Sequence, residues 1–239
     1  MTRLVRGELL KVRTTRTAVG FAAGVGLLTV AIVLLSILAG KPTTISDKRS
    51  ALAVGDGISA LLLIFGVVGA GSEYRHRTLA PALLVAPNRG RLLGARVVAY
   101  ALAALAIGFL MLVVAFALGL PLLAGRPGPA LGAGDYVRAA GGSLIAVVLL
   151  TALGVGVGTL VGRQVPAVVG TMVWLFVLEP LSNLIGHISK FTIGQTATVV
   201  TGDNGGDLLP WGAAFAVMLA WTAAFLVAGA LVDRRRDVT

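Results

Sequence analysis

Residues 71–96 read GSEYRHRTLAPALLVAPNRGRLLGAR and separate two long apolar runs of the chain. The segment carries five arginines, although the connection between two membrane helices is usually a short turn. Because these charges are held between apolar runs, we expect an exposed, positively charged surface close to one face of a membrane. A surface of this kind is suited to docking a soluble partner.

Six apolar stretches are long enough to cross a bilayer, because about 20 helical residues cover a hydrocarbon core of roughly 30 Å. Hydrophobic residues make up 57% of the chain and charged residues only 13%, against about 25% charged residues in soluble domains. The runs are continuous and lack the alternating polarity of barrel strands. The sequence predicts an all-α membrane protein with a single transmembrane domain over residues 1–239. The expected spans are residues 18–39, 51–70, 97–123, 137–161, 165–186 and 211–232.

The distribution of basic residues predicts that both termini are cytoplasmic, because short cytoplasmic loops retain lysine and arginine. With that topology, 14 of the 20 basic residues are inside and 6 are outside. The outside set is Lys41, Lys48, Arg49, Arg126, Arg138 and Lys190. The net charge of +10 is therefore mostly a topology signal, and nucleic-acid binding is not expected.

The first 16 residues are expected to form a short interfacial helix over residues 2–16, in which Leu4, Val5, Leu9 and Val12 alternate with basic residues. The alternative is a charged tail that only anchors topology. The apolar run that follows is longer than a signal-peptide core, so we expect an uncleaved first span.

A break is expected at Glu179-Pro180 in the fifth run, because proline removes a backbone donor and clashes with the preceding turn. The residues that follow are too short and too polar to cross a membrane. They predict a re-entrant segment between spans 5 and 6, buried against protein. An ordinary extracellular loop is the alternative.

Several chemistries have no support in the sequence. None of the four lysines lies in a phosphate-binding loop, so the chain is not expected to hydrolyse ATP or to bind a cofactor itself. There is no cysteine, and the two histidines, His76 and His187, fall on opposite sides of the expected membrane. No metal site or HExxH motif is predicted. Ser143 has no base nearby in sequence and is interpreted as a packing residue.

Gly154, Gly158 and Gly162 recur every four residues in LGVGVGTLVG. Small residues at this spacing form a groove that lets a second helix approach closely. We expect helix packing here, within the chain or in a dimer. A nucleotide-binding reading would need a preceding strand.

Glu179 lies inside an apolar run, where a charge costs about 2.5–3.5 kcal/mol on insertion scales. It is interpreted either as a structural group that caps the re-entrant segment or pairs with Lys190 or His187, or as part of a translocation path. Pro180, Asn183 and His187 complete this possible path or outer gate.

The basic segment also resembles a known family. Glu73 is followed by Arg77-Thr78-Leu79, then by the apolar LLVAP of residues 83–87, then by Arg89-Gly90-Arg91. This order resembles the first cytoplasmic loop of permease subunits of type-2 ATP-binding-cassette exporters. The six spans and the interrupted fifth span resemble that family as well, over nearly the whole chain. Arg77 departs from the pattern, because glycine is common before Thr-Leu.

The resemblance implies a coupling helix in the first cytoplasmic loop, docked on a separate ATP-binding-cassette ATPase. ATP and magnesium would be bound by that partner, and two permease chains, expected as a homodimer, would form the path in a bacterial plasma membrane. The resemblance also implies that transport is directed outward. The implied coupling residues are Glu73, Arg75, Arg77, Thr78, Leu79, Leu83, Leu84, Pro87, Arg89 and Arg91.

Few polar residues lie inside the spans, which favours an amphipathic or drug-like substrate. Three alternatives remain open at this point. The arginines could bind anionic lipid; Glu179 and His187 could serve an intramembrane enzyme as acid and base; or Glu179 could serve a proton-coupled secondary transporter.

Overall fold

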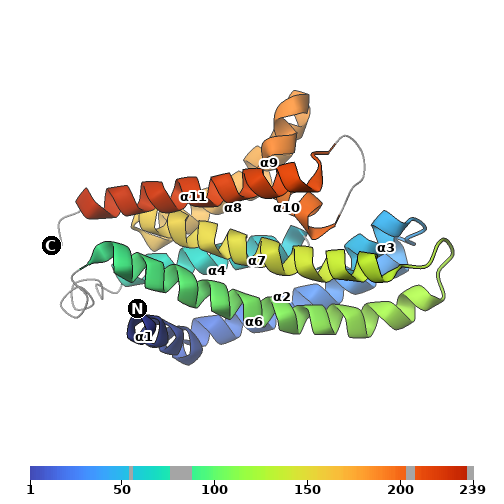
Figure 1. The fold of residues 1–239 in the computed structure, drawn as a ribbon, viewed down its shortest axis with the longest axis horizontal. Helices are drawn as coiled ribbons and strands as arrows, with labels where there is room; N and C mark the ends of the chain where they lie inside the picture. Colours follow the sequence, from blue (N-terminus) through green and yellow to red (C-terminus); the bar gives the residue numbers. More distant parts are fainter. Residues whose placement is uncertain (54–55, 76–87, 203–207, 236–239) are drawn as a thin grey trace.

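The computed structural model describes residues 1–53, 56–75, 88–202 and 208–235, and all the secondary structure in them is helical (Figure 1). The helices are α1 (Thr2–Thr14), α2 (Arg16–Leu34), α3 (Ile45–Leu52), α4 (Asp56–Arg75), α6 (Arg89–Ala124), α7 (Ala133–Val161), α8 (Gln164–Val173), α9 (Glu179–Ser182), α10 (Ile193–Thr201) and α11 (Trp211–Arg235). Two π-helical turns, η1 (Leu35–Ala39) and η2 (Trp174–Leu178), and a 3₁₀ segment, η3 (Asn183–Phe191), complete the chain. The all-α prediction is confirmed for these residues.

Five helices among the described residues are long and apolar enough to cross a membrane. They cover Ala18–Ala39, Arg89–Ala124, Ala133–Val161, Gln164–Gly186 and Trp211–Arg235, and they point to a membrane-embedded protein. In the expected second span, α4 covers Asp56–Arg75, and the stretch of it that was assessed, Ala60–Ser72, is apolar. The predicted start near residue 51 is wrong. Residues 51 and 52 end α3, Ala53 is extended, and α4 begins at Asp56.

The reason for this difference lies in the start of α3. The Thr44 side chain accepts a hydrogen bond from the backbone N–H of Asp47, and the Asp47 carboxylate accepts one from the backbone N–H of Thr44. This capping box begins a separate eight-residue helix before the second apolar run. The Thr44 hydrogen bonds also hold the pKa of Asp47 below its ordinary value.

α7 is the central helix of the bundle, since it packs against α4, α6, α10 and α11. A methyl group at Gly154 would overlap with the carbonyl oxygen of Leu63 on α4, and one at Gly158 would lie 2.7 Å from the carbonyl oxygen of Val67. On another side, a methyl group at Gly156 would lie 2.8 Å from the backbone nitrogen of Leu226 on α11. Helix backbones therefore meet α7 at contact distance on two of its faces.

Gly162 has a different position from Gly154 and Gly158. It ends α7 in the left-handed conformation, with φ at 65°. Its role in the described structure is to stop the helix before α8 begins at Gln164, because a side chain would disfavour this backbone conformation.

The fifth run does not break at Pro180, and that prediction is wrong in its position. The backbone N–H of Glu179 donates to the carbonyl oxygen of Trp174, five residues earlier, so η2 makes one wide turn just before the proline. A widened turn of this type accommodates a residue that cannot join the regular ladder. The sharp reversal comes at Gly186, with φ at 66° and ψ at −101°.

The segment of α9 and η3 projects from the side of the bundle beyond α11 (Figure 1). Leu184 is 84% exposed and Ile185 is 63% exposed. The expectation that this segment is buried against protein is therefore not met within one chain. α10 then returns to the bundle, where Val199 and Val200 are buried.

The bundle has one end that we call the basic end. There α1 lies next to the start of α6, and the C-terminal end of α11 lies on the same side (Figure 1). Arg163, between α7 and α8, belongs to it by the topology of the chain. α3 and the connection from α6 to α7 lie at the opposite end.

We expect Gly154→Ala to destabilise the bundle by about 1–3 kcal/mol, because the added methyl group meets backbone atoms of α4 that cannot move independently. Thermal unfolding of the protein in detergent measures the change. The matched control is Gly141→Ala on the same helix, where a methyl group meets nothing within 4 Å. A destabilisation of the two variants by the same amount would contradict the packing role of Gly154.

Candidate functional site

The start of α6 is tied to the end of α11 at the basic end. Asn88 caps α6 by accepting a hydrogen bond from the backbone N–H of Arg91 at 3.1 Å. The Arg89 guanidinium donates to the backbone carbonyl of Asp233 and lies 4.0 Å from its carboxylate. Asp233 is buried. Since a charge-assisted contact to a buried partner holds position well, α6 and α11 are coupled mechanically here.

α1 packs on the bundle at the same end. Val12 is buried in a cluster that includes Val25 of α2 and Phe65 of α4. Glu8 is also buried, and Lys11 Nζ lies 2.6 Å from its carboxylate. The predicted N-terminal helix over residues 2–16 is found as α1, which covers Thr2–Thr14.

Most of the predicted coupling residues lie outside the described residues. These are Arg77, Thr78, Leu79, Leu83, Leu84 and Pro87. Glu73 and Arg75 are in the last turn of α4, but their side chains are likewise outside the description. Arg89 and Arg91 are in the first turn of α6, so the undescribed stretch 76–87 connects α4 to α6 at the basic end.

Glu179 is positioned by a contact with α10. Its carboxylate accepts a hydrogen bond from the backbone N–H of Gly194, in the first turn of that helix. Thr192 provides the second cap, because its hydroxyl accepts from the backbone N–H of Gln195 at 3.4 Å. A carboxylate at a helix N-terminus is stabilised by the unpaired N–H groups and the helix dipole. The structural interpretation of Glu179 as a cap thus has a geometric basis.

The other residues of the possible path or outer gate surround this cap. Pro180 is in α9, and Asn183 Oδ1 lies 3.5 Å from the Gln195 amide nitrogen across the hairpin. His187 is in η3, and its side chain lies outside the description. Glu179, Asn183 and Gln195 thus meet where α9 faces the start of α10.

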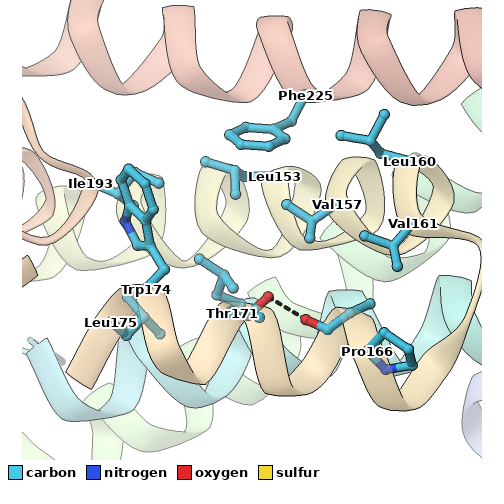
Figure 2. Close-up of a pocket in the computed structure, with 13 residues that line it drawn as sticks. Leu153, Val157, Leu160, Val161, Pro166, Thr171, Trp174, Leu175, Ile193 and Phe225 are labelled. Atoms are coloured by element: carbon cyan, nitrogen blue, oxygen red, sulfur yellow. Dashed lines mark hydrogen bonds between the residues drawn. The ribbon is translucent and has the colours of Figure 1, made fainter. Parts of the chain in front are cut away.

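An apolar cavity of about 220 Å³ lies between α7, α8 and α11 (Figure 2). Leu153 and Val157 of α7 face it from one side, and Phe225 of α11 closes it from another. The one hydroxyl on its wall, that of Thr171, donates to the carbonyl oxygen of Ala167 at 2.8 Å. Trp174 lines it as well, and its indole N–H is buried with no acceptor among the described residues.

A second cavity, of about 300 Å³, adjoins the first. Leu63, Leu175 and Ile193 line both cavities. Glu179, Gln195 and Thr198 are found only on the walls of the second. The two cavities are therefore neighbours, and only the second carries charged and amide groups on its walls.

The opposite end of the bundle holds an ion pair between a buried arginine and a half-buried aspartate. The Arg49 guanidinium of α3 donates to Asp135 of α7 at 3.0 Å and to the backbone carbonyl of Gly202, after α10, at 2.9 Å. The neighbouring Lys48 ammonium lies 3.1 Å from the carbonyl oxygen of Pro129. Both basic side chains are buried, so α3 is held against three other parts of the chain.

The sequence analysis placed Lys48 and Arg49 among the outside basic residues and did not pair Arg49 with Asp135. Their spacing carries no signal, since Arg49 and Asp135 are 86 positions apart. The two cavities were missed for a similar reason, because apolar residues on five helices look alike in sequence whether or not they meet.

No cluster of three or more metal-binding side chains occurs among the described residues. The sequence was compared with protein-family models and with curated proteins, and no match was found in either case.

Glu179→Ala is expected to weaken the start of α10 by about 1 kcal/mol, because the Gly194 N–H loses its acceptor. Hydrogen–deuterium exchange of residues 193–197 measures the loss. Glu179→Gln is the matched variant, since its amide oxygen still accepts the hydrogen bond, and exchange should stay near the original rate. Equal exchange in all three proteins would show that the cap is unimportant.

Arg49→Ala is expected to destabilise the protein by about 3 kcal/mol, because the carboxylate of Asp135 is left without its buried partner. Arg138→Ala, an exposed arginine on α7, is the control and should change little. In an Asp135→Asn background the cost of Arg49→Ala should fall. Additive costs in thermal unfolding would contradict a direct pairing.

Proposed function

We propose that this chain is the membrane-spanning permease subunit of an ATP-driven exporter, with ATP hydrolysis in a separate subunit. The observation that carries the proposal is the basic end of the bundle. The start of α6 and the end of α11 meet there, and the Arg89–Asp233 contact links these two helices.

In this proposal the chain crosses the membrane six times. The five long apolar helices supply five crossings and α4, enclosed by its neighbours, supplies the sixth. The basic end faces the cytoplasm, because arginines gather there in α1, α6 and α11. α1 then lies in the cytoplasmic interface of the plasma membrane, and α3 is at the outer end.

Residues 76–87, with Arg89 and Arg91 beside them, form the docking point for an ATP-binding-cassette ATPase. A push on this segment would reach α6 directly and α11 through Asp233. The chain has no phosphate-binding loop, so the energy must come from the partner, which would bind ATP and magnesium.

Two permease chains would enclose the path. Only 6% of the most apolar stretch of the helix from Gln164 to Gly186 is buried within one chain. This leaves a broad apolar face for a second copy or for lipid. The last part of this helix, α9 and the start of η3, belongs to the proposed re-entrant segment, which continues through η3 to α10. An amphipathic cargo suits walls with few polar groups.

The geometry supports the two alternative functions, an intramembrane enzyme and a proton-coupled transporter, less well. An intramembrane enzyme would need Glu179 as an acid or base, and a proton-coupled transporter would need it as the proton carrier. Its carboxylate accepts a hydrogen bond from Gly194, which gives the residue a structural use that neither alternative requires.

Affinity purification of the tagged chain from its own cells tests the proposal. The expected result is a copurified P-loop ATPase, and Glu73→Ala with Arg77→Ala should lower its yield at least about fivefold, since interface residues at a hot spot typically cost more than 1 kcal/mol. The control is Lys41→Ala with Arg126→Ala at the opposite end, which should leave the yield unchanged. A chain that transports at full rate without any ATPase would refute the proposed function.

A further inference from the structure

A third cavity lies at the end of the bundle opposite to the basic end. It has a volume of about 380 Å³ and is lined by residues of α3, of α6, of the connection from α6 to α7 and of the first turn of α7. Leucines and alanines of α6 and of that connection give it an apolar wall. Its polar side chains are those of Lys48, Arg126 and Tyr136, and no carboxylate lines it among the described residues.

Lys48 brings a buried positive charge to this cavity. The residue is only 4% exposed, and its ammonium contacts the backbone carbonyl oxygens of Arg126, Gly128 and Pro129 at 3.5, 3.4 and 3.1 Å. These partners are dipoles and carry no net charge, and no described carboxylate forms an ion pair with Lys48. A buried charge without a counter-ion costs folding free energy, which an anion in the adjoining cavity would offset.

The acidic side chains nearest in the structure already have other partners. Asp135 is the counter-ion of Arg49, at 3.0 Å. The Asp47 carboxylate accepts a hydrogen bond from the backbone N–H of Thr44, within the capping box of α3. Neither carboxylate lines the cavity, so the charge of Lys48 is not neutralised by them.

Arg126 offers the hydrogen-bond donors that Lys48 does not, because the three carbonyl contacts of Lys48 match its three N–H groups. The side chain of Arg126 makes no hydrogen bond or ion pair with the rest of the described chain. Its guanidinium has five N–H donors in a flat fork that matches a carboxylate or phosphate. The hydroxyl of Tyr136 also has no described partner, and its ring packs on Phe116 with the ring centroids 6.0 Å apart.

We propose that this cavity binds a small organic anion, whose acidic group is held by Arg126 beside the charge of Lys48 and whose apolar body lies against the leucines of α6. An engineered apolar cavity of about 150 Å³ binds benzene, so a cavity of about 380 Å³ has room for a substituted ring together with its acidic group. The site goes beyond the proposed function and is independent of it, because it lies at the end opposite to the ATPase docking point.

¹⁹F NMR of the full chain in phosphatidylcholine nanodiscs tests this inference with two probes of the same shape, 4-fluorobenzoate and 4-fluorobenzamide. The acid carries a negative charge and the amide carries none. The expected result is a saturable change in the resonance of the acid, with the amide binding at least about tenfold more weakly, since a hydrogen bond to a charged group is the stronger one.

The anion can come from a soluble acid or from the head group of an anionic lipid, and native mass spectrometry separates these two sources. The chain is released from nanodiscs that contain both phosphatidylcholine and phosphatidylglycerol. One phosphatidylglycerol that stays on the protein and is lost in Arg126→Met assigns the site to a lipid head group. Binding of 4-fluorobenzoate without such a retained lipid assigns it to a soluble acid.

Four variants locate the binding. Lys48→Met and Arg126→Met each remove one positive charge and keep a long side chain, and each should weaken 4-fluorobenzoate binding at least about tenfold. Ala130→Phe adds a ring to the cavity wall and should abolish the saturable change. The matched control is Arg138→Met, which removes an exposed charge on α7 outside the cavity and should change the affinity less than about twofold.

Equal binding of the acid and the amide would overturn the inference, as would a loss in Arg126→Met no larger than the loss in Arg138→Met. If Lys48→Met folds poorly, Arg126→Met and Ala130→Phe decide the question, because neither position is buried. Capture of an ATPase is a separate measurement, so its failure would count against the proposed function and leave this result unaffected.

Discussion

The structure depends on how closely helix backbones approach α7. In a lipid solvent apolar side chains gain little by leaving one apolar environment for another, so helices associate mainly through close packing. Gly154 and Gly158 bring α4 against one face of α7, and Gly156 brings α11 against another. The positions of α4 and α11 then fix where the basic end gathers its arginines and where the cavities open.

The α8 side of the bundle is more exposed than its centre. Of the most apolar stretch of α7, 61% is buried, against 6% for the helix from Gln164 to Gly186. The widened turn η2 lies in this peripheral helix. Just after η2, the Glu179 carboxylate accepts a hydrogen bond from the backbone N–H of Gly194 and so links the helix to α10. The two cavities lie between α7 and the more exposed α8 side of the bundle, where the side chains do not fill the space.

The sequence was a good guide wherever one property repeats along a single helix. Continuous apolar runs gave the all-helical class and most span boundaries to within a few residues, and small residues four apart marked the packing face of α7. The sequence was a poor guide where a local hydrogen bond or turn, and not the apolar pattern, decides where a helix begins or bends. α3, which begins at the capping box of Thr44 and Asp47, takes up residues 51 and 52 of the second apolar run, and the chain passes Pro180 through a π turn and reverses at Gly186. Contacts between distant positions, such as Arg49 with Asp135, could not be foreseen because no local pattern encodes them.

The burial of α4 also bears on how the protein is made. Leu62, Leu63 and Val67 of α4 are enclosed by other parts of the chain. Its principal neighbour, α7, follows later in the chain. During synthesis α4 therefore emerges from the ribosome before the helix that covers most of its surface exists.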